Sequence, residues 1–194
     1  MGACLAASSH FLSQSFGGYH FSYYLCKHLE NIDHLMNDDI TTEQRSDEEY
    51  FVASKRYRAE VLNMADELKD NPLRFTITNV ITMDVEITKS DLKTIVGKNT
   101  QDNRFNAFKN KLAQDIKGFI EKSTYEGWRE VIPGKHPETA YFAYFSRQLG
   151  EKAYLCIRKI KNTGLFKPYA IIDQKTFDAE IQNLKKKKTA ELIC

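Results

Sequence analysis

The sequence predicts an α+β fold, in which N-terminal helices precede an antiparallel β-meander that is packed with helices. Two patterns lead to this prediction. Residues 74–88 place apolar side chains at every second position with mostly polar ones between them, as in a half-buried strand. Residues 139–173 contain three β-favouring segments that are separated by glycine-containing turns. We expect two domains, a helical N-terminal lobe over residues 1–72 and an α+β domain over residues 73–194.

Two helices are expected in the N-terminal lobe. Apolar residues at helical spacing follow Gly18 and stop at residues 37–39. The second helix begins with a capping box, because the Ser46 hydroxyl can accept a free backbone N–H and Glu49 can reach back to the cap. Pro72 follows its end, since proline does not continue a helical hydrogen-bond ladder.

The first half of the α+β domain combines strand and helix patterns. Residues 74–88 are long for one strand, so a bend or hairpin near Asn79 is possible within them. A short helix is expected from a cap at Thr88 to Gly97. One longer amphipathic helix is expected next, with apolar residues at steps of three and four: Phe105, Phe108, Leu112, Ile116 and Phe119. A loop is expected over residues 127–137.

The second half of the domain carries the meander. Its strands are predicted at Thr139–Arg147, Lys152–Ile160 and Phe166–Asp173. A final helix is predicted to begin at about Gln174. Whether the N-terminal helices cover the sheet or form a separate lobe stays open at this point.

Composition indicates a globular protein of a reducing compartment. Charged residues make up 28% and hydrophobic residues 42% of the 194 residues, which is ordinary for a globular chain. The four cysteines are scattered without a CxxC pair, which argues against a disulfide framework or a structural zinc site. No apolar run approaches the roughly 20 residues that a membrane span needs. We therefore expect a cytoplasmic location, without a signal peptide or a transmembrane segment.

A lipid anchor is a second possibility for the N-terminus. Gly2 follows Met1 and could be myristoylated, and Cys4 could be palmitoylated. Position 6 is Ala where the myristoylation pattern prefers Ser or Thr, which favours an ordinary N-terminus.

Charge is distributed unevenly along the chain. Residues 1–100 contain 10 Lys and Arg against 15 Asp and Glu, a net charge of −5. Residues 101–194 contain 18 against 11, a net charge of +7. This asymmetry favours a nucleic-acid partner for the basic half and a protein partner for the acidic half. A solvated helix end at Lys185–Lys188 is the alternative explanation for four of the positive charges.

The sequence lacks the motifs of several enzyme classes. It contains no GxxxxGK[ST], HExxH, GxSxG or GxGxxG, so P-loop enzymes, zincins, α/β-hydrolases and Rossmann dehydrogenases are not expected. His20 and His28 lie eight residues apart, too far to share a metal ion on one helix, and His34 points in another direction. We predict neither a metal nor a cofactor.

His136 is the strongest candidate for a chemical role. It follows Lys135 in a loop that leads into a strand, and loops often carry catalytic groups. Metal-independent cleavage of RNA needs an acid, a base and cations that hold the phosphate, and His, carboxylates, Lys and Arg supply these. Glu138 or Glu130 would be the partner of His136. The predicted catalytic residues are His136, Lys135, Glu138, Arg147 and Arg158, and the predicted substrate-binding residues are Tyr141, Tyr144 and Lys159.

The same stretch has a purely structural interpretation. Many chains of this length contain a His, two Arg and a few Tyr within 25 residues, so a polar loop that leads into an aromatic-cored hairpin also explains residues 133–161.

Residues 84–173 resemble domains of polyvalent proteins from phages and mobile elements. The resemblance lies in the order of VEITKSDLKTIVG, FIEKSTYEGW, KHPETAYFAYFSRQLGEKAYLCIRKIK and KPYAIID. Those domains are grouped with the barnase, EndoU, colicin and RelE-type nucleases, which share helices followed by a curled antiparallel meander. The resemblance implies a toxin- or effector-type ribonuclease, or a domain that has lost catalysis and binds a protein or polyanion. This sequence has no second positioned His after the meander, which some of those nucleases use, and it does not match a catalytic set residue by residue.

Overall fold

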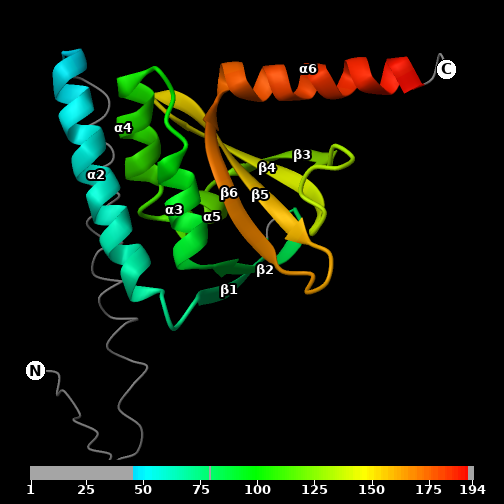
Figure 1. The fold of residues 1–194 in the computed structure, drawn as a ribbon, viewed down its shortest axis with the longest axis horizontal. Coiled ribbons are helices and arrows are strands. Elements are labelled where there is room, and N and C mark those ends of the chain that lie inside the picture. Colours follow the sequence, from blue (N-terminus) through cyan, green and yellow to red (C-terminus); the bar gives the residue numbers. More distant parts are fainter. Residues whose placement is uncertain (1–45, 79, 192–194) are drawn as a thin grey trace, which may run out of the picture. The chain divides into compact units, whose positions relative to one another are not determined.

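The fold is α+β, as predicted, and is built around one six-stranded sheet (Figure 1). The structure is a computed structural model that describes residues 46–78 and 80–191. The first predicted helix, the N-terminal histidines and Gly2 lie outside the described residues. The strands are β1 (Leu73–Thr78), β2 (Thr82–Ile87), β3 (Thr124–Glu130), β4 (Thr139–Leu149), β5 (Glu151–Ile160) and β6 (Phe166–Asp173). The helices are α2 (Asp47–Glu67), α3 (Lys89–Gly97), α4 (Asn103–Leu112), α5 (Ile116–Glu121) and α6 (Gln174–Glu191).

The sheet is mixed rather than purely antiparallel, which corrects the prediction. Its strand order is β1-β2-β6-β5-β4-β3. Every neighbouring pair is antiparallel except β2 and β6, which run parallel and pair only at Val85 and Phe166. The hairpin β1–β2 extends the sheet beyond β6, because β2 pairs with the edge of β6 that β5 leaves free. Helices α3, α4 and α5 separate β2 from the meander in the chain. A parallel pair needs such a long crossover connection.

Strand β3 was not predicted: residues 127–137 were expected to form a loop, and that prediction is wrong for residues 127–130. Residues 124–130 form the edge strand beside β4. Gly127, with φ of 114°, lies at a register shift that follows Tyr125. The bulge and the charged residues of an edge strand hide the apolar alternation that marks a half-buried strand.

The hairpin near Asn79 is confirmed, with Ile77 paired to Met83 across the β1–β2 ladder. The single long helix predicted over residues 105–119 is instead two helices. Asp115 interrupts it by capping α5, because its side chain accepts the Gly118 N–H at 2.8 Å. A Cβ at position 118 would collide with that carboxylate, so glycine permits this sharp restart.

Both predicted helix caps are present. Ser46 and Glu49 form the capping box of α2, and Thr88 and Asp91 form a second one at α3. Each box supplies partners for N–H groups that the first turn of a helix leaves unsatisfied.

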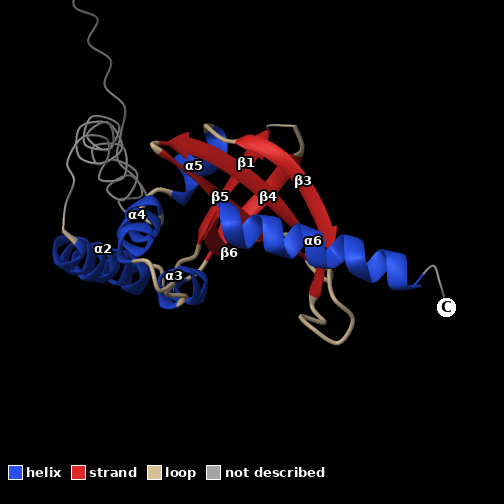
Figure 2. Cartoon of the chain, turned by 90° about the horizontal axis from the view of Figure 1, so that it is seen from above, coloured by secondary structure: helices blue, strands red, loops and turns tan. Residues whose placement is uncertain are grey.

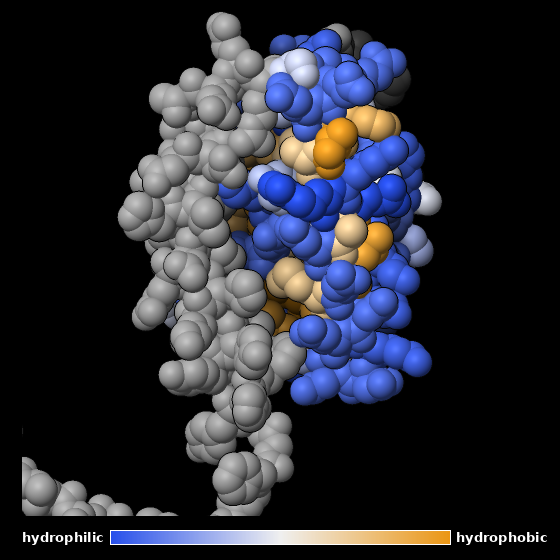
Figure 3. Space-filling view, turned by 90° about the vertical axis from the view of Figure 1, so that its left-hand side faces the viewer, coloured by the Kyte–Doolittle hydropathy of each residue, from blue (hydrophilic) through white to orange (hydrophobic). Residues whose placement is uncertain are grey.

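Helix α2 belongs to the same compact unit as the sheet. It packs on α4 through Ala53, Tyr57 and Ala107, and Asn110 donates to the Ser54 carbonyl at 3.1 Å. One compact unit, Asp39–Cys194, contains both α2 and the sheet. Figure 3 views the described surface from the α2 side of Figure 1, where it is mostly hydrophilic with small hydrophobic areas.

The central strands are buried on both faces, and cross-strand register separates the two sets of side chains. One set contains Phe142, Tyr144, Cys156 and Ala170, and Phe177 of α6 packs against it. We call this side the α6 face, and α6 runs across it (Figures 1 and 2). The alternate residues of β4 and β5, such as Ala143, Phe145 and Leu155, lie on the opposite face.

Candidate nucleic-acid site at the start of β4

His136 lies in the turn that leads into β4 and points toward the α6 face. Its φ of 50° makes it the non-glycine residue with positive φ among the described residues, a conformation that costs energy. Its Nε2 atom lies 3.3 Å from the hydroxyl oxygen of Tyr169 on β6. Its ring also contacts Phe142 edge-on, with the centroids 5.6 Å apart. The turn therefore holds the imidazole against two aromatic rings of the sheet.

Arg158 lies beside this pair and joins three elements. It is opposite Phe142 in the β4–β5 ladder, so it shares the α6 face. Its Nη1 atom is 3.0 Å from Glu138, and its Nη2 atom is 3.5 Å from the buried carboxylate of Asp91 at the start of α3. Its guanidinium carbon is 5.8 Å from the centre of the Tyr169 ring. Its Nε atom is buried without a hydrogen-bond partner among the described residues.

Lys98 adds a second cation to the same place. It follows α3, and its Nζ atom lies 3.1 Å from the centre of the Tyr169 ring. Partial burial lowers the pKa of Lys98 from 10.5 to about 8. Tyr169 is thus surrounded by an imidazole, a guanidinium and an ammonium from three separate segments. We call His136, Glu138, Arg158, Tyr169 and Lys98 the His136 cluster.

Tyr144 does not offer the stacking surface that was predicted for it. It is 1% exposed, and burial raises the pKa of its hydroxyl. It accepts a hydrogen bond from Arg129 and donates one to Glu180 of α6. Arg129 and Glu180 also form an ion pair at 3.0 Å. This group ties α6 to the sheet, so Tyr144 has a structural role here.

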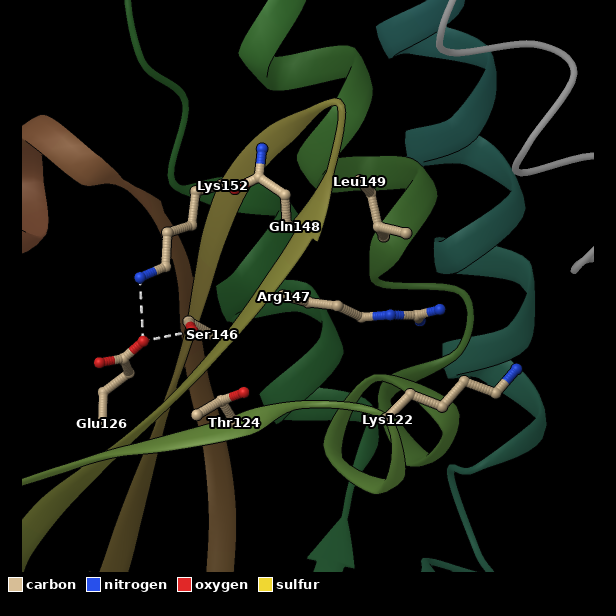
Figure 4. A pocket seen from close by; sticks show the side chains of 8 residues that line it. All are labelled: Lys122, Thr124, Glu126, Ser146, Arg147, Gln148, Leu149 and Lys152. Carbon is tan, nitrogen blue, oxygen red and sulfur yellow. Dashed lines mark hydrogen bonds and ion pairs between the residues drawn. The ribbon is translucent and has the colours of Figure 1, made fainter.

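Arg147 lies apart from the His136 cluster. It pairs with Ala153 and is five residues from Phe142 on β4, an odd separation that puts it on the opposite face and about 16 Å along the strand. It borders an open depression of about 390 Å³ near the β4–β5 turn. Figure 4 shows Arg147 and Lys122 on one side of β4 and Lys152 with Glu126 on the other. The predicted catalytic set therefore does not converge as a whole.

Lys135 is exposed, and its side chain makes no hydrogen bond or ion pair with the described residues. Of the five predicted catalytic residues, the structure brings together His136, Glu138 and Arg158. Lys98 and Tyr169 were missed, because neither sits in a motif and only the sheet order brings β6 beside β5.

Tyr141 and Lys159, two predicted substrate-binding residues, do lie together. They pair across β4 and β5 on the opposite face, and the Lys159 Nζ atom is 5.6 Å from the centre of the Tyr141 ring. Trp128 on β3 is 57% exposed, and its ring centre is 5.6 Å from that of Tyr141. Trp128 was missed because residues 127–137 were expected to form a loop. It is the one tryptophan of the chain, which is the signal that could have directed attention to it.

No group of three or more His, Cys, Asp or Glu side chains that could hold a metal ion occurs in the described part of the chain. None of the described helices is long and apolar enough to cross a membrane. In comparisons with protein-family models, curated proteins and solved structures, no match to this chain was found. The chemistry of the described side chains is therefore the basis for a functional proposal.

Proposed function

We propose that this domain cleaves RNA phosphodiester bonds without a metal ion and that His136 takes part in proton transfer. The observation that supports the proposal is the contact of His136 with Tyr169, beside the cations of Arg158 and Lys98. Imidazole exchanges protons near neutral pH, and the two cations can stabilise the negative charge of a phosphorane. Tyr169 serves as a positioning residue that orients the His136 ring.

The proposed reaction needs two proton transfers. The carboxylate of Glu138 takes the proton of the ribose 2′-hydroxyl, and the 2′-oxygen attacks phosphorus. His136, in its imidazolium form, gives a proton to the 5′-oxygen as the P–O5′ bond breaks. The products are a 2′,3′-cyclic phosphate and a 5′-hydroxyl end, so atoms and charge balance. Arg158 holds Glu138 at 3.0 Å, and in this proposal its positive charge also stabilises the phosphorane.

The test is cleavage of a fluorescently labelled single-stranded RNA in the presence of EDTA. Wild-type protein is expected to release fragments that end in a cyclic phosphate. His136→Gln keeps a polar side chain and is expected to lower the rate by about 10²–10⁴-fold, the usual contribution of acid–base catalysis. Full activity in that variant, or no cleavage of any RNA by the wild type, contradicts the proposal.

A non-catalytic binding domain is the second candidate. The exposed Trp128 beside Tyr141 and Lys159 favours it, since stacking on aromatic rings needs no reacting group. This candidate predicts RNA binding that weakens as salt rises, without turnover. A protein partner for the acidic N-terminal half belongs to the same candidate. For either function we propose a cytoplasmic setting, as a domain of the effector or mobile-element type.

A further inference from the structure

We infer that single-stranded RNA binds with its unpaired bases stacked on the surface formed by Trp128, Tyr141 and Lys159, which we call the aromatic surface. The inference rests on the proposal that the domain acts on RNA, and it specifies the class of RNA. It adds a recognition surface on the sheet face opposite to the His136 cluster.

The rings of this surface are arranged for contact with a partner. Trp128 is 57% exposed, although burial of an indole ring is strongly favourable. The planes of Trp128 and Tyr141 meet at 58°, so the two rings are tilted and not stacked on each other. Tyr141 also contacts the buried Phe166 of β6, with ring centres 6.2 Å apart, which supports it from below. A planar base can therefore stack on Trp128 while Tyr141 limits its position.

Lys159 gives the surface its charge preference. Its Nζ atom is 5.6 Å from the Tyr141 ring centre and 5.4 Å from that of Phe166, and it forms no ion pair with the described residues. An ammonium beside a stacking ring suits a nucleotide, which carries both a π-face and a phosphate. Glu130 pairs with Tyr141 and places a carboxylate on the same face, so it opposes the phosphate rather than assisting.

The chemistry selects single strands over duplexes. Bases in a duplex are stacked on one another, so their faces are hidden from protein rings, whereas unpaired bases present them. Tyr141 and Phe142 are consecutive residues on opposite faces of the sheet. A flexible single strand that crosses the start of β4 can thus touch the aromatic surface and the His136 cluster together.

The single tryptophan provides a direct measurement. His136→Gln protein, which is not expected to cut RNA, is titrated with a single-stranded oligonucleotide and with a duplex of the same sequence. Stacking on Trp128 is expected to quench the intrinsic tryptophan fluorescence with the single strand and not with the duplex. Anisotropy of labelled RNA then gives the affinity of variants. Trp128→Ala is expected to raise Kd by about 5- to 150-fold, the equivalent of 1–3 kcal/mol for one stacked base. Lys159→Gln is expected to raise it less, and Glu130→Gln to lower it.

A matched control is present on α2. Phe51 is 45% exposed and has the Lys55 Nζ atom 4.1 Å from its ring centre, so Phe51→Ala removes a similar aromatic–lysine pair elsewhere. This variant is expected to bind RNA as before. Absence of quenching with the single strand, or equal loss in Phe51→Ala and Trp128→Ala, overturns the inference.

Failure of this inference is distinguishable from failure of the proposed function. If wild-type protein never cuts RNA but quenching and the Trp128 effect are present, the aromatic surface stands and the cleavage proposal falls. If RNA is cut but Trp128→Ala leaves both Kd and the single-strand preference unchanged, the aromatic surface falls and cleavage stands.

Discussion

The Nε2 atom of His136 lies 3.3 Å from the hydroxyl oxygen of Tyr169, although 33 residues separate them in the chain. The contact exists because β5 lies between β4 and β6, and both partners project onto the α6 face of this part of the six-stranded sheet. The positive φ of His136 directs the ring inward from the turn. The relationship joins a loop residue to a strand residue, so the sheet determines where the imidazole lies.

Tyr169→Phe tests whether this contact positions His136. Loss of the hydroxyl is expected to lower kcat for RNA cleavage by roughly 10-fold with KM nearly unchanged, because the hydroxyl contacts His136 and is not assigned to substrate binding. The split between kcat and KM is the readout, because a general loss of stability would not lower kcat alone. Tyr125→Phe is the control, because that ring packs on Phe145 on the opposite face. An unchanged kcat in Tyr169→Phe would count against a positioning role.

The two arginines of the meander are expected to behave differently. Arg158→Gln removes a cation that contacts Glu138 and Asp91, so cleavage should fall by about 10²-fold or more. Arg147→Gln lies on the opposite face and should leave dinucleotide cleavage within about twofold of the wild type. Kinetics of both variants under identical salt decide the matter. Equal losses in the two variants would contradict the site described here.

Lys98 is expected to make the proposed RNA binding depend on pH. Its pKa of about 8 means that it is a cation at pH 7 and largely neutral at pH 9. RNA binding by His136→Gln protein is therefore expected to weaken as pH rises from 7 to 9. The same protein with Lys98→Gln added is expected to show a smaller change over this pH range. Lys98→Arg keeps a positive charge throughout this range and is expected to bind equally at both pH values. A wild-type-like pH dependence in Lys98→Gln would show that another group titrates.

Tyr144→Phe is expected to destabilise the fold by about 1–3 kcal/mol, because it removes a buried hydroxyl from charged partners. Arg129 and Glu180 would keep their ion pair but lose the bridging oxygen. Tyr154→Phe is the matched comparison, since its hydroxyl donates to the amide oxygen of Gln174 and lies beside Lys152 but bridges no ion pair, and its loss should cost less. Urea denaturation gives both values. Equal costs would show that the charges of the Arg129–Glu180 pair add nothing at Tyr144.

Lys109 should make stability rise with pH. It is 1% exposed, it donates to the Lys98 carbonyl at the end of α3, and burial lowers its pKa from 10.5 to about 8. Between those two values the unfolded chain binds more protons than the folded one, so the free energy of unfolding increases as pH rises. Urea denaturation gives the free energy of unfolding at pH 8 and pH 10. This free energy is expected to rise less between the two pH values in Lys109→Met than in the wild type. Parallel changes in both proteins would rule out the contribution of Lys109.

Much of the fold was predictable because its signals are local. The boxes at Ser46 and Thr88, the hairpin near Asn79 and the start of α6 at Gln174 each depend on a few neighbouring residues. The break between α4 and α5 was not predicted, because the apolar residues keep their helical spacing on both sides of Asp115. The first helix nevertheless ends at Leu112, and the Asp115 side chain caps the second. Strand β3 was missed since a bulged edge strand lacks a clean alternation.

The candidate site was only partly predictable. The turn at Gly150 sets the β4–β5 register, which brings Arg158 close to Glu138 and to the turn that carries His136. The meander was predicted correctly, so this part of the site could be predicted as well. Arg147 carries a charge that could bind phosphate, but it lies on the opposite face of the sheet, since an odd number of residues separates it from Phe142. Tyr169 depends on a register shift between β5 and β6 that follows Cys156. Such a shift changes which side chains of β5 and β6 lie on the same face, and the residue pattern within either strand does not indicate it.

The sequence by itself determined the α+β class, the helix caps and the three strands of the meander, because hydrogen bonds and apolar periods within short segments encode them. Only the tertiary structure decided that Lys98 and Tyr169 join His136, that Arg147 stands apart and that Trp128 is exposed beside Tyr141. Those relationships depend on strand order, register and the packing of α3 against β6. They are set by contacts between segments that are distant in the chain.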